Sequence, residues 1–300
     1  MRDVIIIGGG PAGCTAGIYS ARKKLDTLLI AKDFTGQIGH SSWVENYPGF
    51  KKIKGLDLAK SFKSHLESFA IDINEFEEVK EIRKYEESFT VLTDEGEYNT
   101  RSVIICSGAK TKKLGIPNEE KFLGKGISYC VTCDESSFEG KDVAVVGGGN
   151  AGVEATIELT SFAKKVYLLE CEDRLSADEV LVERLRKEGG DIITACEITK
   201  FKGEKELKGL IYMKDGKEEV IEVDGCFIEI GSKANTDFVK GVVDLNDKGE
   251  IVVDPRTLET SVKGIFAAGD VVDFKDKQVV IATGQGAVAA LSAYRYITSV

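Results

Sequence analysis

The sequence Asp3-Val-Ile-Ile-Ile-Gly-Gly-Gly-Pro-Ala-Gly13 decides the fold, and it recurs nearly unchanged as Asp142-Val-Ala-Val-Val-Gly-Gly-Gly-Asn-Ala-Gly152. Each copy is a β-branched apolar run followed by a glycine turn and a helix-like stretch, over 12–24 in the first copy and 151–163 in the second. A second apolar run follows each copy, at 27–30 and at 166–169. The repeat therefore predicts two βαβ nucleotide-binding units.

The glycines of each copy have the spacing Gly-x-Gly-x-x-Gly, which lets the backbone approach a pyrophosphate at a helix N-terminus. An isolated match is more commonly a turn that packs a helix on a strand. Two copies in two βαβ contexts favour dinucleotide binding, and Pro11 suits the first helical turn because its φ is fixed there. The glycines concerned are Gly8, Gly10 and Gly13 in the first copy and Gly147, Gly149 and Gly152 in the second.

Composition excludes several classes of protein. A chain of 300 residues that is 42% hydrophobic and 30% charged is globular and long enough for two domains. Its net charge of -10 argues against a nucleic-acid partner, because phosphate binding needs clustered Lys and Arg. Met1-Arg2-Asp3 leads directly into the first apolar run, and no apolar run has the length of a signal peptide or a membrane helix. We therefore expect a cytoplasmic protein that does not bind membranes.

The rest of the chain fits one block inserted into another. Residues 72–93 alternate in polarity, which predicts antiparallel strands, and 101–106 predicts a strand before Ser107-Gly108. Residues 192–231 are again strand-rich, with a Lys-Asp-Gly turn at 214–216. The last segment predicts a strand and turn at 264–270 and a helix at 284–297. Hinges are expected in 111–117 and 240–249, where charged and glycine-bearing segments separate the apolar runs.

The chemistry is predicted to lie in a cysteine pair, Cys130-Val-Thr-Cys133, followed by Asp134. Two intervening residues can bring the sulfurs within bonding reach. A zinc half-site would need a second close pair or spaced histidines, and the sequence has only His40 and His65. Asp134 is the adjacent titratable group, which could hold a proton during thiol exchange or could cap a helix N-terminus.

These residues together resemble the low-molecular-weight thioredoxin reductases, and more closely the carboxy-terminal reductase portion of the alkyl hydroperoxide reductase flavoprotein. The resemblance covers nearly the whole chain. The shared motifs are the two glycine motifs, Glu45-Asn-Tyr-Pro-Gly49, the Cys-Val-Thr-Cys-Asp sequence at 130–134, Phe266-Ala-Ala-Gly-Asp270, and Lys277-Gln278. The resemblance implies an α/β protein of two Rossmann-like, three-layer ββα domains, the second inserted into the first. The FAD-binding domain would comprise 1–113 and 244–300, and the NAD(P)H-binding domain would comprise 114–243.

The resemblance also implies the cofactor contacts. For FAD they are Gly8, Gly10, Pro11, Ala12, Gly13, Gln37, Asn46, Val79, Ser107, Gly108, Asp270, Lys277, Gln278 and Val279. For NADH they are Gly147, Gly149, Asn150, Ala151, Gly152 and Glu170. One departure is Thr35-Gly36-Gln37, where many relatives have Gly-Gly-Gln, because a β-branched residue disfavours positive φ.

NADH is the predicted donor rather than NADPH. Glu170 follows the second glycine motif by about 20 residues, where a carboxylate holds a ribose 2′-hydroxyl. A solvated glutamate at a strand end is the other interpretation. NADPH-using relatives carry His-Arg-Arg and a further Arg where this chain has Glu170, Cys171, Glu172 and Ser176. Replacing arginines by carboxylates weakens binding of a 2′-phosphate.

By the same resemblance, Cys133 faces the flavin and Cys130 attacks a disulfide of a thioredoxin- or glutaredoxin-like partner, and the enzyme is a homodimer. The alkyl hydroperoxide reductase flavoprotein has an additional amino-terminal thioredoxin-like segment, so we expect electrons here to pass to a separate protein. Two alternatives remain, a ferredoxin donor to the same fold and a non-catalytic flavin or thiol redox sensor. Glutathione-reductase-like enzymes need a histidine from an interface domain, and ferredoxin-NADP reductases lack the cysteine pair.

Overall fold

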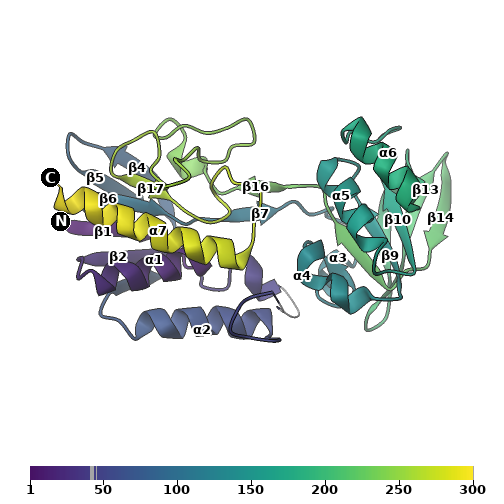
Figure 1. The fold of residues 1–300 in the computed structure, drawn as a ribbon, viewed down its shortest axis with the longest axis horizontal. Helices are drawn as coiled ribbons and strands as arrows, with labels where there is room; N and C mark the ends of the chain where they lie inside the picture. The colour runs from purple at the N-terminus through teal and green to yellow at the C-terminus, as the bar shows by residue number, and fades with distance from the viewer. Residues whose placement is uncertain (41–43, 45, 300) are drawn as a thin grey trace. The chain divides into compact units, whose positions relative to one another are not determined.

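The computed structural model describes residues 1–40, 44 and 46–299, and within these the chain forms two compact units (Figure 1). The outer unit contains Met1–Gly39, Tyr47–Lys110 and Lys233–Val300. The inner unit contains His40–Asn46 and Thr111–Ser232. Most of the inner unit is one continuous insertion between two parts of the outer unit, the arrangement predicted from the two expected hinges and from the family resemblance.

Within the described residues, the outer unit is built on a seven-stranded sheet in the order β3-β2-β1-β6-β5-β4, with β17 beside β6. β1 (Arg2–Ile7) lies between β2 (Thr27–Ala31) and β6 (Glu97–Ile105) and is parallel to both. β17 (Ile265–Ala267) is parallel to β6. Central parallel strands are buried on both faces, which is why the last four residues of β1 form a continuous apolar run.

Helices α1 (Pro11–Arg22) and α7 (Val279–Thr298) lie side by side in the outer unit, and α2 (Gly55–Glu67) packs beside α1 (Figure 1). Gly286 permits this approach, because a Cβ there would run into the Ala12 carbonyl oxygen. The helix predicted over 284–297 begins earlier, at Val279. Its first residues are rich in β-branched side chains, whose low helix propensity hid the start, and tertiary packing overrides that propensity.

Residues 72–93 differ from the prediction. β4 (Val79–Lys84) and β5 (Phe89–Thr93) form an antiparallel pair, and β5 is antiparallel to β6, but β3 (Asp72–Glu75) is parallel to β2. The prediction was therefore wrong for β3. Alternating polarity reports which face of a strand is buried and does not report the direction of its neighbour.

The inner unit contains, among the described residues, a five-stranded parallel sheet in the order β11-β10-β9-β15-β8. Its strands are β8 (Ile127–Ser128), β9 (Asp142–Val146), β10 (Lys165–Leu169), β11 (Asp191–Ile193) and β15 (Gly225–Ile228). Its longer helices are α5 (Asn150–Leu159) and α6 (Glu179–Glu188). β9, α5 and β10 form the second predicted βαβ unit.

An antiparallel sheet of β12 (Glu197–Gly203), β13 (Leu207–Lys214) and β14 (Lys217–Ile221) completes the inner unit. Asp215 and Gly216 join β13 to β14 with φ of 51° and 73°. Positive φ at both central residues is the hairpin geometry that Asp-Gly favours, so the predicted turn is confirmed. The short elements are η1 (Gln37–His40), α3 (Glu119–Phe122), α4 (Val131–Asp134), η2 (Glu135–Phe138) and η3 (Asp237–Val239).

The long insertion of the inner unit is flanked by β7 (Ala109–Thr111) and β16 (Ser232–Ala234), which pair with each other. The second connection therefore precedes the hinge predicted in 240–249. The reason is packing, because Val239 and Val243 are buried in the same core cluster as Ile5 and Val103 of the outer sheet. No helix in the described part of the chain is both long and apolar enough to cross a membrane.

Candidate functional site

The first glycine loop joins β1 to α1 and has the geometry of a phosphate cradle. Gly8 has φ of 115°, and a Cβ there would run into the Cys106 carbonyl oxygen. A Cβ on Gly13 would run into the Gly8 carbonyl oxygen, so α1 can pack against the loop only with glycine at this position. A Cβ on Gly10, in contrast, would have no atom of the described residues within 4 Å, and Gly10 is the N-cap residue of α1. The loop thus leaves space at a helix N-terminus, which fits a pyrophosphate.

Asp270 and Gln37 lie together in the outer unit. Gln37 Nε2 donates to Asp270 Oδ2 at 3.1 Å, and the backbone of neighbouring Gly269 donates to Gln285 Oε1 at 2.8 Å. Burial raises the pKa of Asp270, and the charge of Lys277 opposes that effect. The Lys277 ammonium contacts the Val272 carbonyl oxygen and lies 2.9 Å from Glu250 Oε1. The Lys277 ammonium therefore donates to acceptors of the protein itself.

The other predicted flavin contacts are spread over the structure. Ser107 Oγ donates to the Asn235 carbonyl at 2.8 Å, and Asn235 Nδ2 donates back to the Ser107 carbonyl at 2.8 Å. Sequence reasoning missed Asn235, whose backbone also donates to the Gly108 carbonyl. Val79 is the buried first residue of β4, Gln278 caps α7, and Val279 begins it. Asn46 is exposed and groups with the inner unit, and Glu45 lies outside the described residues.

The departure at Thr35 is accommodated by its neighbour. Gly36 takes the positive φ, 53°, and Asp33 Oδ1 accepts hydrogen bonds from the backbone of Thr35 and Gly36 at 2.8 and 2.9 Å. The turn before Gln37 therefore needs a glycine at 36 and not at 35.

The second glycine loop, between β9 and α5, repeats the first. Gly147 has φ of 123°, and a Cβ on Gly152 would run into the Gly147 carbonyl oxygen. Among the described residues, a Cβ on Gly149 would have only Ser176 Oγ within 4 Å, at 3.8 Å. The same fit to a pyrophosphate therefore exists here. Asn150 begins α5, and its side chain exchanges hydrogen bonds with Asp178, at 3.0 and 2.8 Å.

Glu170 lies beside this second loop, just past the end of β10. Its carboxylate accepts from the Gly148 backbone, from the Glu172 backbone at 2.9 Å and from the Cys171 thiol at 3.1 Å. Burial acts to raise the pKa of Glu170, but these hydrogen bonds outweigh it and hold the pKa below its ordinary value. A carboxylate has about four lone-pair sites, so it can still accept from a ribose hydroxyl.

Cys130 and Cys133 form a disulfide in the inner unit, with a Cα–Cα distance of 5.3 Å. Cys130 precedes α4 as its N-cap residue, and Cys133 lies within that helix. The predicted pairing is confirmed. The remaining cysteines are free: Cys171 is exposed, and Cys14, Cys106, Cys196 and Cys226 are buried. Burial raises the pKa of Cys14 to about 12 and raises that of Cys106 and Cys226 as well, which keeps these thiols inert.

Asp134 is tied to the disulfide through a serine that sequence reasoning missed. Buried Ser128 donates from Oγ to Asp134 Oδ2 at 2.6 Å and accepts from the Cys130 backbone N–H at 3.0 Å. Asp134 makes no side-chain capping hydrogen bond to η2. A hydroxyl two residues before the first cysteine was the available signal for Ser128.

Three glutamates of the inner unit, Glu135, Glu158 and Glu229, interact electrostatically. Burial, with repulsion from Glu158 on α5, raises the pKa of Glu135 to about 7. Burial, again with Glu158, raises the pKa of Glu229 to about 7. The Glu229 carbonyl oxygen is also the atom that a Cβ on Gly147 would strike, so this residue lies against the second glycine loop.

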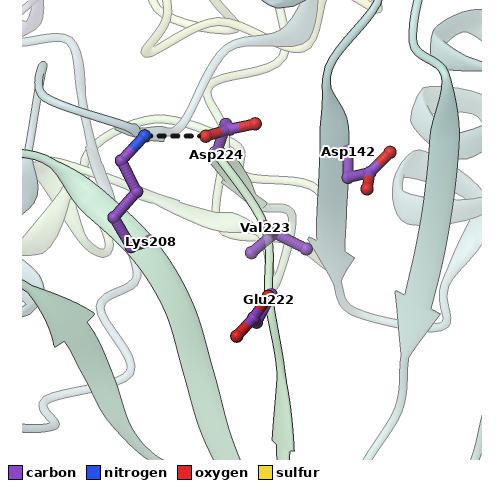
Figure 2. A pocket seen from close by; sticks show the side chains of 5 residues that line it. All are labelled: Asp142, Lys208, Glu222, Val223 and Asp224. Carbon is purple, nitrogen blue, oxygen red and sulfur yellow. Dashed lines mark hydrogen bonds and ion pairs between the residues drawn. The ribbon is translucent and has the colours of Figure 1, made fainter.

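A hollow of about 350 Å³ lies at the other end of the inner sheet, lined by Asp142, Lys208, Glu222, Val223 and Asp224 (Figure 2). Figure 2 shows Lys208 facing Asp224, with Nζ 2.8 Å from Oδ1. Asp142 begins β9 and Asp224 precedes β15, so the hollow is at the amino ends of parallel strands. Ligands of open α/β sheets bind outside the carboxyl ends, where the glycine loop lies.

Two dinucleotide-binding folds, one inserted into the other in sequence, and a disulfide-bonded Cys-x-x-Cys pair together define a nucleotide-dependent disulfide oxidoreductase. The chain belongs to the pyridine nucleotide-disulphide oxidoreductase family, which it matches over residues 2–288. The family implies FAD and a pyridine nucleotide as cofactors.

Similar proteins agree with this assignment. The F subunit of alkyl hydroperoxide reductase in Staphylococcus aureus (strain MRSA252) is 42% identical over 299 residues, which cover 98% of this chain and 59% of that protein. The chain thus spans about three-fifths of the length of that relative. Thioredoxin reductase from Streptococcus pyogenes MGAS5005 has a similar structure, with TM-score 0.95 and 35% identity over 100% of this chain and 99% of that chain. Thioredoxin reductase from Giardia duodenalis follows, with TM-score 0.93 and 33% identity over 99% of each chain.

Proposed function

We propose that this protein passes electrons from NADH, through FAD and the Cys130–Cys133 disulfide, to a disulfide of a thioredoxin- or glutaredoxin-like protein. The observation that carries the proposal is the bonded cysteine pair in a unit whose own glycine loop is held by Glu170. In this proposal the outer unit, which also contains residues 233–243, binds FAD, and the inner unit binds NADH. We also propose a homodimer, on the resemblance to thioredoxin reductases.

The residues that would hold FAD are those of the first glycine loop, with Asp270 and Gln37 beside it. When bound, FAD supplies a two-electron carrier between a nicotinamide and a disulfide. Gly10 leaves space for the pyrophosphate at the α1 N-terminus, where the helix dipole favours its negative charge. Asp270 accepts from Gln37 and would accept from a ribityl hydroxyl.

In the inner unit, Gly149 leaves the corresponding space for the NADH pyrophosphate. Glu170 would accept a hydrogen bond from the adenosine ribose, and its charge repels the 2′-phosphate that distinguishes NADPH. Its hydrogen bonds to the Gly148 and Glu172 backbones fix the carboxylate before any nucleotide arrives. Such preorganisation reduces the cost of binding.

The thiols then act in sequence. Two electrons and two protons convert the Cys130–Cys133 disulfide to two thiols. The Cys130 thiolate attacks a sulfur of the partner disulfide, forming a mixed disulfide and releasing one partner thiolate, which takes up a proton. The Cys133 thiolate attacks the Cys130 sulfur, restoring the internal disulfide and releasing the second partner thiolate. Asp134, held by Ser128, is the group we propose to accept and return the protons.

An anaerobic titration with NADH, followed by addition of an oxidised thioredoxin, tests the proposal. We expect NADH to bleach the flavin absorbance and thioredoxin to restore it. The Cys130→Ser variant should bleach at the parent rate and fail to reduce thioredoxin. If NADH leaves the flavin oxidised and reduced ferredoxin bleaches it, ferredoxin would replace NADH as the electron donor in the proposal. A preparation that holds no FAD would overturn it.

A further inference from the structure

A buried glutamate of the inner unit has no part in the thiol steps above, although it lies between the chain connection and the cysteine pair. Glu119 begins α3 and is 3% exposed. Oε1 accepts from the Leu114 backbone N–H at 3.0 Å, and Oε2 accepts from the Gly115 backbone N–H at 2.7 Å. Leu114 and Gly115 follow β7 closely, so this carboxylate holds the start of the inner unit's chain.

The same carboxylate also reaches the residue that precedes Cys130. Tyr129 donates from its hydroxyl to Glu119 Oε1 at 2.6 Å. Burial and this hydrogen bond raise the pKa of Tyr129, so the phenol remains a donor at any physiological pH. Leu114, Ile116 and Tyr129 also pack against one core cluster of the inner unit. One side chain thus joins the connecting segment to the backbone that carries the redox-active cysteine.

We propose that Glu119 is a positioning residue for the disulfide chemistry. Acting through Tyr129, it holds Cys130 at a fixed position relative to residues 114–115, which follow β7. The proposal rests on the proposed function for its significance. Cys130 is then fixed from two sides, through Ser128 at its own backbone N–H and through Tyr129 at the preceding side chain. Fixing one cysteine raises the effective concentration of its thiol at the other, which favours the disulfide over the dithiol.

The hydrogen-bond chemistry predicts which substitutions break the connection. Glutamine at 119 has one acceptor oxygen. Placed like Oε1, it still accepts from Leu114 and Tyr129 but without the charge that strengthens these bonds, and it cannot accept from Gly115, whose amide contacts the other carboxylate oxygen. Phenylalanine at 129 removes only the hydroxyl and leaves both amides bonded to Glu119. The matched control is Glu120→Gln, because Glu120 is 80% exposed and pairs with Lys113 at 2.8 Å at the surface. Surface pairs of this kind contribute little.

The test measures the equilibrium constant between the Cys130–Cys133 disulfide and dithiothreitol in the full chain, by thiol labelling of the folded protein. We expect Glu119→Gln and Tyr129→Phe each to shift it toward the dithiol by about threefold or more, part of the roughly tenfold to hundredfold that a hydrogen bond to a charged group represents. Glu120→Gln should leave it unchanged. The double variant Glu119→Gln/Tyr129→Phe should shift it no further than Tyr129→Phe alone, because both substitutions act through the one bond between Glu119 and Tyr129.

Amide exchange of Leu114 and Gly115 provides the second measurement. Glu119→Gln should accelerate at least one of the two amides about tenfold, and Tyr129→Phe should leave both protected. If Glu119→Gln does not fold, Tyr129→Phe alone still decides through the redox equilibrium. The proposal is overturned if Tyr129→Phe leaves that equilibrium within about twofold of the parent, or if the two shifts add in the double variant. Neither measurement uses NADH or a partner protein, so failure of the proposed function would not be mistaken for failure of this one.

Discussion

Glu170→Gln is the substitution that most directly tests the predicted choice of nucleotide. The Glu170 carboxylate is partly exposed, is hydrogen-bonded to the Gly148 and Glu172 backbones, and is ionised at neutral pH because its pKa lies below the ordinary value. Two like unit charges about 5 Å apart repel by about 3 kcal/mol at an effective dielectric near 20. Solvent screening at a partly exposed site reduces this to about 1–2 kcal/mol.

Removing the charge should therefore improve NADPH affinity about tenfold, since about 1.4 kcal/mol corresponds to a factor of ten. It should also weaken NADH, because a hydrogen bond to a charged acceptor contributes about 1.5–3 kcal/mol and a neutral amide replaces it at roughly half strength. The ratio of kcat/KM for NADPH over NADH should rise between about tenfold and a hundredfold.

The assay is stopped-flow bleaching of the flavin absorbance under anaerobic conditions, over a range of NADH and NADPH concentrations and at two ionic strengths. Glu183→Gln, the same chemical change on the exposed side of α6, is the control and should leave the ratio unchanged. The effect of Glu170→Gln should shrink at high salt, because it is partly electrostatic. A ratio that stays within about twofold of the parent at low salt would refute the role assigned to Glu170.

Three further results are expected. Gly13→Ala places a Cβ against the Gly8 carbonyl oxygen and should lower the flavin-to-protein absorbance ratio. Gly152→Ala makes the same clash in the inner unit and should leave the flavin content unchanged. Equal flavin loss in both variants would contradict the assignment of the two loops. Cys133→Ala should form a stable mixed disulfide between Cys130 and a thioredoxin whose second active-site cysteine is replaced by Ser and whose first carries a thionitrobenzoate leaving group, visible by mass spectrometry, and no adduct at Cys130 would count against its role as nucleophile. The pKa of Glu229 is raised to about 7 in the folded state, from about 4.5 in the unfolded state. Between these two values the folded state therefore binds a proton that the unfolded state does not. The stability that this proton gives is complete below the unfolded pKa and is lost as the pH rises through about 7. Urea unfolding should show the parent losing on the order of 2 kcal/mol between pH 5 and pH 8 and Glu229→Gln losing less, and parallel pH profiles would exclude Glu229 as the cause.

The sequence by itself determined the two dinucleotide folds and the cysteine pair. The physical reason is that these features are local, since a glycine loop depends on φ, on close backbone approach and on a neighbouring strand and helix within about 30 residues. Gly8 and Gly147 adopt the positive φ that such a loop requires. Two cysteines separated by two residues come within bonding distance over one turn of helix, and α4 supplies that turn here.

Only the tertiary structure decided the features that depend on residues distant in sequence. The direction of β3, the position of the second connection at 232–234 and the start of α7 at Val279 follow from packing between segments far apart in the chain. The same holds for the hydrogen bond from Asn235 to Ser107 and for the hydrogen bonds that the Glu119 carboxylate accepts from Gly115 and Tyr129. Local patterns report burial and propensity, whereas hydrogen-bond partners across the fold become visible only when the chain has brought them together.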